Sequence, residues 1–241
     1  MLTTTPTADD LIKHVILSLE NAMKSQSPLT DDVLALDGFT GKMTRHFYNN
    51  ICNQGRKIHY LEVGTWKGSS LISAIQGNEE HVVCTVVDNW SQFNGPRDQF
   101  ITNCTKNLKE GYKINILDAD SFSVDVSKIP PTDVYLYDGD HTHEAQFKGI
   151  THYVSCLKSP AIVIVDDWNW PSVREGTRDG LIAANIRVVY EKEIRHTYDN
   201  SHSPMTLAAQ QFWNGLAVFV VEKHDIVPVT VIQKERKYSI L

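Results

Sequence analysis

Residues 133–170 read DVYLYDGDHTHEAQFKGITHYVSCLKSPAIVIVDDWNW and contain two apolar runs on either side of a polar stretch long enough for a helix. The runs, VYLY and AIVIV, are rich in β-branched and aromatic residues, which is typical of buried strands. Acidic residues end both runs, Asp138 and Asp140 after the first and Asp166 and Asp167 after the second. A strand, a helix and a second strand in succession predict a parallel pair, so the two acidic clusters are expected to converge at one edge of a sheet.

The same alternation of apolar runs and helical stretches extends along most of the chain. Seven runs fit strands, and they occupy residues 58–63, 81–87, 112–117, 133–137, 161–165, 186–190 and 216–221. This order is typical of a doubly wound α/β fold. We predict a Rossmann-like, seven-stranded sheet with helices on both faces and the last strand antiparallel, in which a ligand binds beyond the carboxyl ends of the strands.

Two helical patterns precede the first strand, at residues 8–24 and 41–52, with a polar loop between them. A chain of 241 residues, 41% of them hydrophobic, can bury one substantial core. We therefore expect residues 1–52 to form an N-terminal helical cap on one main domain, residues 53–241. The first helix carries more apolar residues than one packed face requires, so we expect it to cover the functional site or to mediate a homodimer.

The composition argues against several classes of partner. A net charge of −6 and a pI near 5.9 are unfavourable for a nucleic-acid partner, which usually requires a basic patch. The four cysteines have no CxxC spacing, which favours buried free thiols over disulfides or a zinc site. No run approaches the roughly 18 apolar residues of a membrane span, so we expect a cytoplasmic protein with no membrane partner.

The first strand is followed by EVGTWKGSS, residues 62–70, which predicts a glycine turn and the start of a helix. Such a turn lets a ligand approach the backbone closely, and free amides at a helix start favour an anion. Gly64 and Gly68 give a G-x-x-x-G spacing, not the G-x-G-x-x-G of a dinucleotide site, and a purely structural turn is the alternative. The second strand ends in Asp88, which is placed either to accept hydrogen bonds from ribose hydroxyls or to cap a turn.

Five segments resemble motifs of the class I S-adenosylmethionine-dependent methyltransferases. They are LEVGTWKGSS (61–70), VVDNW (86–90), DADSF (118–122), YLYDGDHTHE (135–144) and IVDDWNW (164–170). More narrowly, the chain resembles the metal-dependent O-methyltransferases, a group that includes catechol O-methyltransferase and the macrolide-sugar and aminocoumarin-sugar enzymes. The resemblance implies that residues 53–241 form a methyltransferase domain that uses S-adenosylmethionine.

The resemblance also assigns residues to the methionine part of the cofactor. It implies that Glu62 and the loop from Gly64 through Thr65 to Gly68 hold this part, and that Ser70 lies near the carboxylate. These residues surround the end of the first predicted strand.

Further residues are implied for the rest of the cofactor. Asp88 would bind the ribose, and Asp120 and Ser121 would lie beside the adenine. The segment LDGFTGKM, residues 36–43, resembles the part that closes over the cofactor, which adds Gly38 and Phe39.

The acidic residues after the fourth and fifth strands correspond to a metal site in this group. The resemblance implies that Asp138, Asp166 and Asp167 hold a divalent cation. Three converging carboxylates repel one another and raise one another's pKa, so a cation is their natural partner. Ligands that are all oxygen suit Mg²⁺ better than Zn²⁺. The alternative is that these residues cap a helix and a turn.

His141, three residues after Asp138, stands where the group places its base, and we predict that it takes the proton from the acceptor hydroxyl. Asp140 is the rival, because the aminocoumarin-sugar relatives use an aspartate there. No lysine occupies this position, which favours a sugar hydroxyl over a catechol as the acceptor. Four aromatic residues follow acidic motifs: Trp168 and Trp170 come after Asp167, and Trp90 and Phe93 come after Asp88. They would either form a platform for a sugar or aromatic ring or pack in the core.

We therefore predict a metal-dependent O-methyltransferase that moves the methyl group of S-adenosylmethionine to a hydroxyl of a small molecule, a sugar or glycoside. A catechol-type enzyme is the first alternative. An NAD-dependent oxidoreductase, an iron-dependent hydroxylase and a noncatalytic cofactor-binding subunit are the others. Arg174 and Arg178, in residues 172–180, would lie near an acidic group of the substrate or form surface salt bridges.

Overall fold

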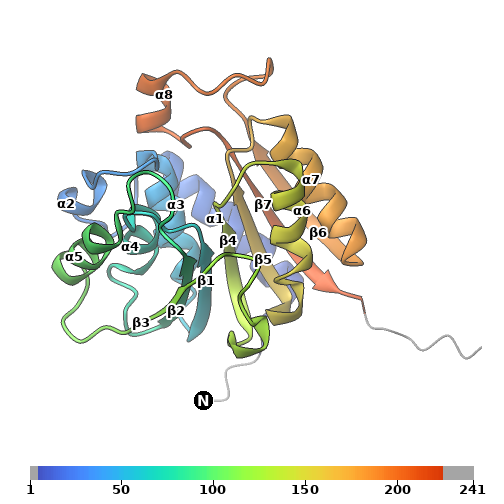
Figure 1. The fold of residues 1–241 in the computed structure, drawn as a ribbon, viewed down its shortest axis with the longest axis horizontal. Coiled ribbons are helices and arrows are strands. Elements are labelled where there is room, and N and C mark those ends of the chain that lie inside the picture. The colour runs from blue at the N-terminus through green and yellow to red at the C-terminus, as the bar shows by residue number, and fades with distance from the viewer. Residues whose placement is uncertain (1–4, 225–241) are drawn as a thin grey trace, which may run out of the picture.

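One mixed seven-stranded sheet forms the centre of the computed structural model, which describes residues 5–224 (Figure 1). The strands lie in the order β3-β2-β1-β4-β5-β7-β6, and β7 runs antiparallel to both of its neighbours. Their bounds are β1 Ile58–Val63, β2 Val82–Asp88, β3 Ile114–Asp118, β4 Thr132–Tyr137, β5 Leu157–Asp166, β6 Ile186–Ile194 and β7 Leu216–Lys223. The predicted fold class, including the antiparallel last strand, is confirmed.

Helices cover both faces of the sheet (Figure 1). On one face pack α1 (Ala8–Met23), α3 (Lys42–Cys52), α4 (Ser69–Ile75) and α5 (Arg97–Asn107), and on the other α6 (His143–Thr151) and α7 (Pro171–Ala183). Alternate residues of β4 serve the two layers, because successive strand side chains point to opposite faces. Val134 and Leu136 join the first layer, and Tyr135 and Tyr137 join the second.

Short elements complete the connections. They are α2 (Asp31–Leu34), α8 (Met205–Gln210) and the 3-10 turns η1 (Val126–Lys128) and η2 (Val154–Cys156). Both α2 and α8 lie in stretches that the sequence predicts as polar loops. All four cysteines are buried and free, as expected, and among the described residues no helix is long and apolar enough to cross a membrane.

The first helix is built into the main core. A capping box between Thr7 and Asp10 starts α1, which buries Leu11, Val15 and Leu19 against α3 and the sheet. Residues 5–52 therefore share one apolar layer with β5 and β7. The predicted boundary at residue 52 falls at the end of α3.

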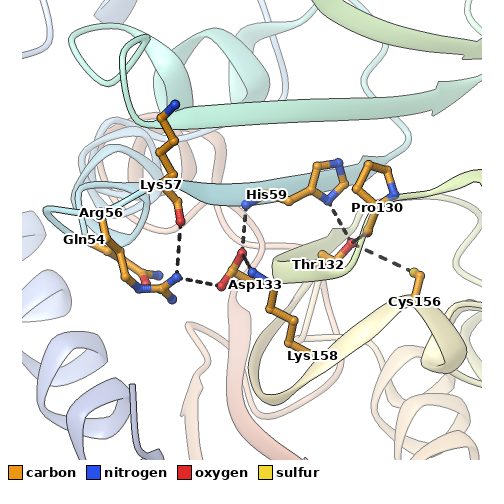
Figure 2. A network of polar contacts seen from close by, with 9 residues as sticks. All are labelled: Gln54, Arg56, Lys57, His59, Pro130, Thr132, Asp133, Cys156 and Lys158. Atoms are coloured by element: carbon orange, nitrogen blue, oxygen red, sulfur yellow. Dashed lines mark hydrogen bonds and ion pairs between the residues drawn. The ribbon is translucent and has the colours of Figure 1, made fainter. Parts of the chain in front are cut away.

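The amino ends of the strands are joined by a buried polar network (Figure 2). The Asp133 carboxylate, at the start of β4, accepts hydrogen bonds from the His59 amide at 2.9 Å, from Arg56 at 2.9 Å and from Lys158 at 2.7 Å. Two cations and an amide thus stabilise one buried carboxylate. This network ties β1, β4 and β5 together at the edge of the sheet opposite their carboxyl ends.

Candidate active site

A cavity of about 710 Å³ lies at the carboxyl ends of the parallel strands. The loops that follow β1 to β5 supply most of its lining, as expected for this fold. The predicted residues that line it are Phe39, Gly64, Thr65, Ser70, Asp88, Asp120, Ser121, Asp138, Asp140, His141 and Asp167. The other predicted residues, Gly38, Glu62, Gly68 and Asp166, do not line it.

Both predicted glycines are required by the backbone. Gly64 has a φ of +86°, and a Cβ there would lie 2.0 Å from the carbonyl oxygen of Asp138. Gly68 has a φ of +83° and starts α4, and a Cβ there would lie 2.9 Å from the Phe100 ring. Gly64 therefore permits the close approach of the loops after β1 and β4, which brings the cofactor motif beside the acidic motif.

Glu62 supports the wall of the cavity through Ser70. Its carboxylate is fully buried and accepts hydrogen bonds from the hydroxyls of Tyr60 and Ser70, both at 2.7 Å. Burial raises the pKa of Glu62 to about 7. Ser70 reaches the cavity wall, so Glu62 holds a lining residue in place.

Asp88 organises the loop after β1. Its carboxylate accepts the backbone amides of Thr65 at 2.9 Å, Trp66 at 2.8 Å and Trp90 at 2.7 Å. Trp66 and Trp90 both have positive φ, at +45° and +47°, and these hydrogen bonds hold the two residues in that conformation. The predicted ribose acid is therefore also the anchor of the cofactor loop.

Three side chains converge between the ends of β4 and β5. Asp138, His141 and Asp167 each offer one ligand atom, and these atoms all lie within 4.8 Å of one another. Nε2 of His141 is 2.7 Å from Oδ2 of Asp167. Burial, together with Asp166 and Asp167, raises the pKa of Asp138 well above its usual range, because three carboxylates share this space.

The structure separates Asp166 from this group. Asp166 is 3% exposed, and its Oδ1 accepts the amide of Asp167 at 3.0 Å. Burial, followed by the Asp167 carboxylate, raises the pKa of Asp166 well above its usual range. Adjacent residues at a strand end point to different sides, and the φ of +57° at Asp167 turns the second carboxylate towards the cavity.

The residues near His141 have distinct environments. Asp140 is exposed, and hydrogen bonds from Thr142, including the amide at 2.8 Å, lower the pKa of its carboxyl. His143 pairs with Asp179 at 2.9 Å on the surface, as expected for a helix residue outside the site.

Aromatic rings form a continuous wall along the cavity. Consecutive rings lie 4.5 to 6.1 Å apart between centroids, in the order Phe93, Trp66, Phe39, Trp213, His202, Trp170 and His141. Of the predicted aromatic residues, Trp170, Phe93 and the largely buried Trp90 line the cavity, whereas Trp168 is buried in the core.

Trp66, His202 and Trp213 were not identified from the sequence. His202 and Trp213 come from the 191–214 segment, which carries no motif, and only its return to the sheet brings them to the site.

The two arginines of residues 172–180 support the surrounding structure. Arg174 donates to the carbonyl oxygens of Trp168 and Asn169, at 2.9 and 2.6 Å. Arg178 pairs with Glu191 and Glu193. Neither side chain lines the cavity. Arg178 therefore agrees with the salt-bridge alternative, whereas Arg174 binds backbone carbonyl oxygens.

Comparisons with known proteins identify a family match and structures of similar fold. A family model described as a methyltransferase domain matches residues 61–168, from β1 to just beyond β5. That range contains Asp88, Asp138, His141 and Asp167. No curated protein matches the chain.

Solved structures share the fold at low sequence identity. A "putative O-methyltransferase" from Klebsiella pneumoniae is 12% identical, with 92% of each chain covered and a TM-score of 0.54. Cofactor-bound Rv0187 from MTB is 13% identical over 92% of this chain and 100% of that chain, with a TM-score of 0.54. SMU.776, described as complexed with SAH, is 12% identical over 77% of this chain and 50% of that chain, with a TM-score of 0.53. Residues 61–168 therefore resemble a methyltransferase domain in sequence, and the described chain shares its Rossmann-like fold with these solved structures.

Proposed function

We propose that this protein transfers the methyl group of S-adenosylmethionine to a hydroxyl of a small molecule, a sugar or glycoside, with the help of a divalent cation. One observation carries the proposal. A single cavity extends from the glycine loop after β1 to the cluster of Asp138, His141 and Asp167. A cofactor on the loop and an acceptor on the cluster would therefore face each other, which is the positioning that a methyl transfer needs.

The loop after β1 fits the cofactor. S-adenosylmethionine supplies an electrophilic methyl group on a sulfonium. Thr65 Oγ1 and Trp66 Nε1 are buried and lack a hydrogen-bond partner within residues 5–224, so a bound ligand can satisfy them. Asp120 and Ser121 also line the cavity, and the adenine is proposed to lie beside them. Phe39 stacks on Trp66 with centroids 4.5 Å apart and would exclude water from this end.

The cluster fits a cation. Asp167 Oδ1 is buried and has no hydrogen-bond partner in the described part of the chain, and the nearby Asp138 adds a second carboxylate. A divalent cation bound to a hydroxyl oxygen lowers the pKa of that hydroxyl and orients it. Either His141 or Asp140 would then receive the proton, since both line the cavity.

The aromatic wall supports a ring-shaped acceptor. Trp170, His202 and Trp213 line the cavity, and aromatic faces pack well against the apolar side of a sugar ring. The same rings would stack on an aromatic diol, which is the second candidate acceptor. The methyltransferase match disfavours an NAD-dependent oxidoreductase.

Two measurements test the proposal. Calorimetry should detect binding of S-adenosylhomocysteine and no binding of NADH. A screen of glycosides, nucleotide sugars and catechols with methyl-labelled S-adenosylmethionine should then give a product only when a divalent cation is present. Tight NADH binding, or undiminished transfer in excess chelator, would refute the corresponding part.

A further inference from the structure

An imidazole shares the space of the two carboxylates that face the cavity. The ligand atoms of Asp138, His141 and Asp167 lie within 4.8 Å of one another, whereas Asp166 is outside this group. The site therefore presents two carboxylates and one nitrogen, in place of three carboxylates.

The contact between His141 and Asp167 is not a formed hydrogen bond. Nε2 lies 2.7 Å from Oδ2 of Asp167, yet this buried nitrogen has no hydrogen-bond partner among residues 5–224. A hydrogen bond requires the N–H to point at the acceptor, so the ring nitrogen is aimed past that oxygen. Oδ1 of Asp167 is also unpaired in the described chain, and the Asp167 side chain is only 9% exposed.

The ring of His141 is also held in its orientation. Trp170 packs edge-on against it, with centroids 4.9 Å apart and an interplanar angle of 70°. Oδ1 of Asp166, by contrast, accepts the Asp167 amide, and Asp166 does not belong to the group of converging ligand atoms. An oriented imidazole and an occupied second carboxylate both favour His141 as the third ligand.

We propose that His141 binds the divalent cation directly, together with Asp138 and Asp167, and that its nitrogen makes the site prefer Mn²⁺ or Co²⁺ over Mg²⁺. Imidazole suits transition metals, whereas Mg²⁺ prefers oxygen ligands. This inference rests on the proposed function and specifies its metal site. It also moves the proposed role of proton acceptor from His141 to its rival Asp140, because a metal-bound Nε2 has no free lone pair.

Electron spin echo envelope modulation on the Mn²⁺-loaded protein, without cofactor, tests the ligand directly. The wild-type spectrum should contain a ¹⁴N coupling typical of a bound imidazole, and uniform ¹⁵N labelling should replace this signal with a ¹⁵N coupling. His141→Ala and His141→Gln should remove the coupling. His143→Ala, two residues away on the surface, should keep it, and so should Asp166→Asn, which preserves an acceptor for the Asp167 amide.

Calorimetric titrations with each metal alone test the selectivity. His141→Ala should weaken Mn²⁺ and Co²⁺ binding at least about tenfold and Mg²⁺ binding less. A wild-type spectrum without nitrogen coupling, or a coupling that survives in both His141 variants with unchanged metal affinities, overturns the proposal. Thermal unfolding confirms that each variant is folded.

The two proposals fail separately. Cation-dependent methyl transfer without nitrogen coupling would leave the proposed function standing and remove His141 from the metal. Nitrogen coupling in a protein that does not bind S-adenosylhomocysteine would keep His141 as a metal ligand and refute the proposed methyl transfer.

Discussion

Gly64 is the residue at which the cofactor loop and the acidic loop come closest. Its φ of +86° disfavours any side chain, and a Cβ would lie 2.0 Å from the Asp138 carbonyl oxygen. We expect Gly64→Ala to destabilise the protein by about 2 to 5 kcal/mol, from left-handed backbone strain plus overpacking. Urea unfolding measures this. Gly55→Ala is the control, because Gly55 has a φ of +64° and open space around it, and it should cost about 1 kcal/mol. Equal costs would refute the steric explanation.

Asp88 combines loop anchoring with the proposed ribose contact. Asp88→Asn would replace one of the oxygens that accept the amides of Thr65, Trp66 and Trp90. One unsatisfied amide costs about 1 to 3 kcal/mol, so we expect the affinity for S-adenosylhomocysteine to fall about 5- to 100-fold. Calorimetry measures the change, and Asp98→Asn, an exposed position that does not line the cavity, is the control. An unchanged affinity in Asp88→Asn would show that Asp88 neither anchors the loop nor contacts the cofactor.

At the scale of elements, the network at the amino ends of the strands makes stability depend on pH. Burial lowers the pKa of His59 from 6.5 to about 4, so the unfolded chain binds a proton more readily than the folded protein between these values. Stability should therefore fall as pH falls from 6.5 towards 4, by at most about 3 kcal/mol for this residue. Urea unfolding at pH 7 and pH 5 checks this, and His59→Gln should show a smaller decrease. An identical decrease in the variant would exclude His59 as a source.

The segment between β6 and β7 supplies one wall of the cavity. Its ring at Trp213 lies beside Phe39 and His202. If this wall packs against the acceptor, Trp213→Ala should raise the KM of the acceptor about tenfold, the worth of one aromatic contact, and should change cofactor affinity less. Tyr198→Ala is the control, since Tyr198 lies in the same segment but is 81% exposed. A larger effect on the cofactor would assign the wall to the cofactor instead.

For the whole molecule, α1 is part of the core and not an appendage. Leu11, Val15 and Leu19 are buried, and each contributes about 1.5 to 3 kcal/mol. Their sum is comparable to the whole stability of a typical domain, so removal of residues 1–25 should give a protein without a cooperative unfolding transition. Circular dichroism during heating tests this. A folded truncated protein would show that α1 is dispensable.

The opposite side of α1 bears on the expected homodimer. Ile16 and Leu17 are 41% and 55% exposed. We expect Leu17→Glu to convert a homodimer to a monomer in sedimentation experiments without loss of fold, because the side chain faces outward. A wild-type monomer would refute the assembly.

The sequence by itself determined the fold class and the edge of the sheet that carries the site. Periodicity and strand-end residues are local properties, and a parallel sheet brings its carboxyl ends together whatever the details of packing. The strand at residues 58–63 was predicted to the residue, and Asp88, Asp138 and Asp167, which follow or end predicted strands, line the cavity.

Only the tertiary structure decided which of Asp166 and Asp167 faces the cavity. It also revealed the backbone oxygen of Asp138 with which a side chain at Gly64 would clash. The orientation of the Asp167 side chain depends on the positive φ of that residue, and the orientation of Asp166 depends on its contact with the Asp167 amide. Two consecutive aspartates in the sequence do not reveal either feature. His202 and Trp213 reach the cavity through a long connection without a motif. Such contacts join residues far apart in the chain, so they depend on the packing of the whole molecule and not on local sequence.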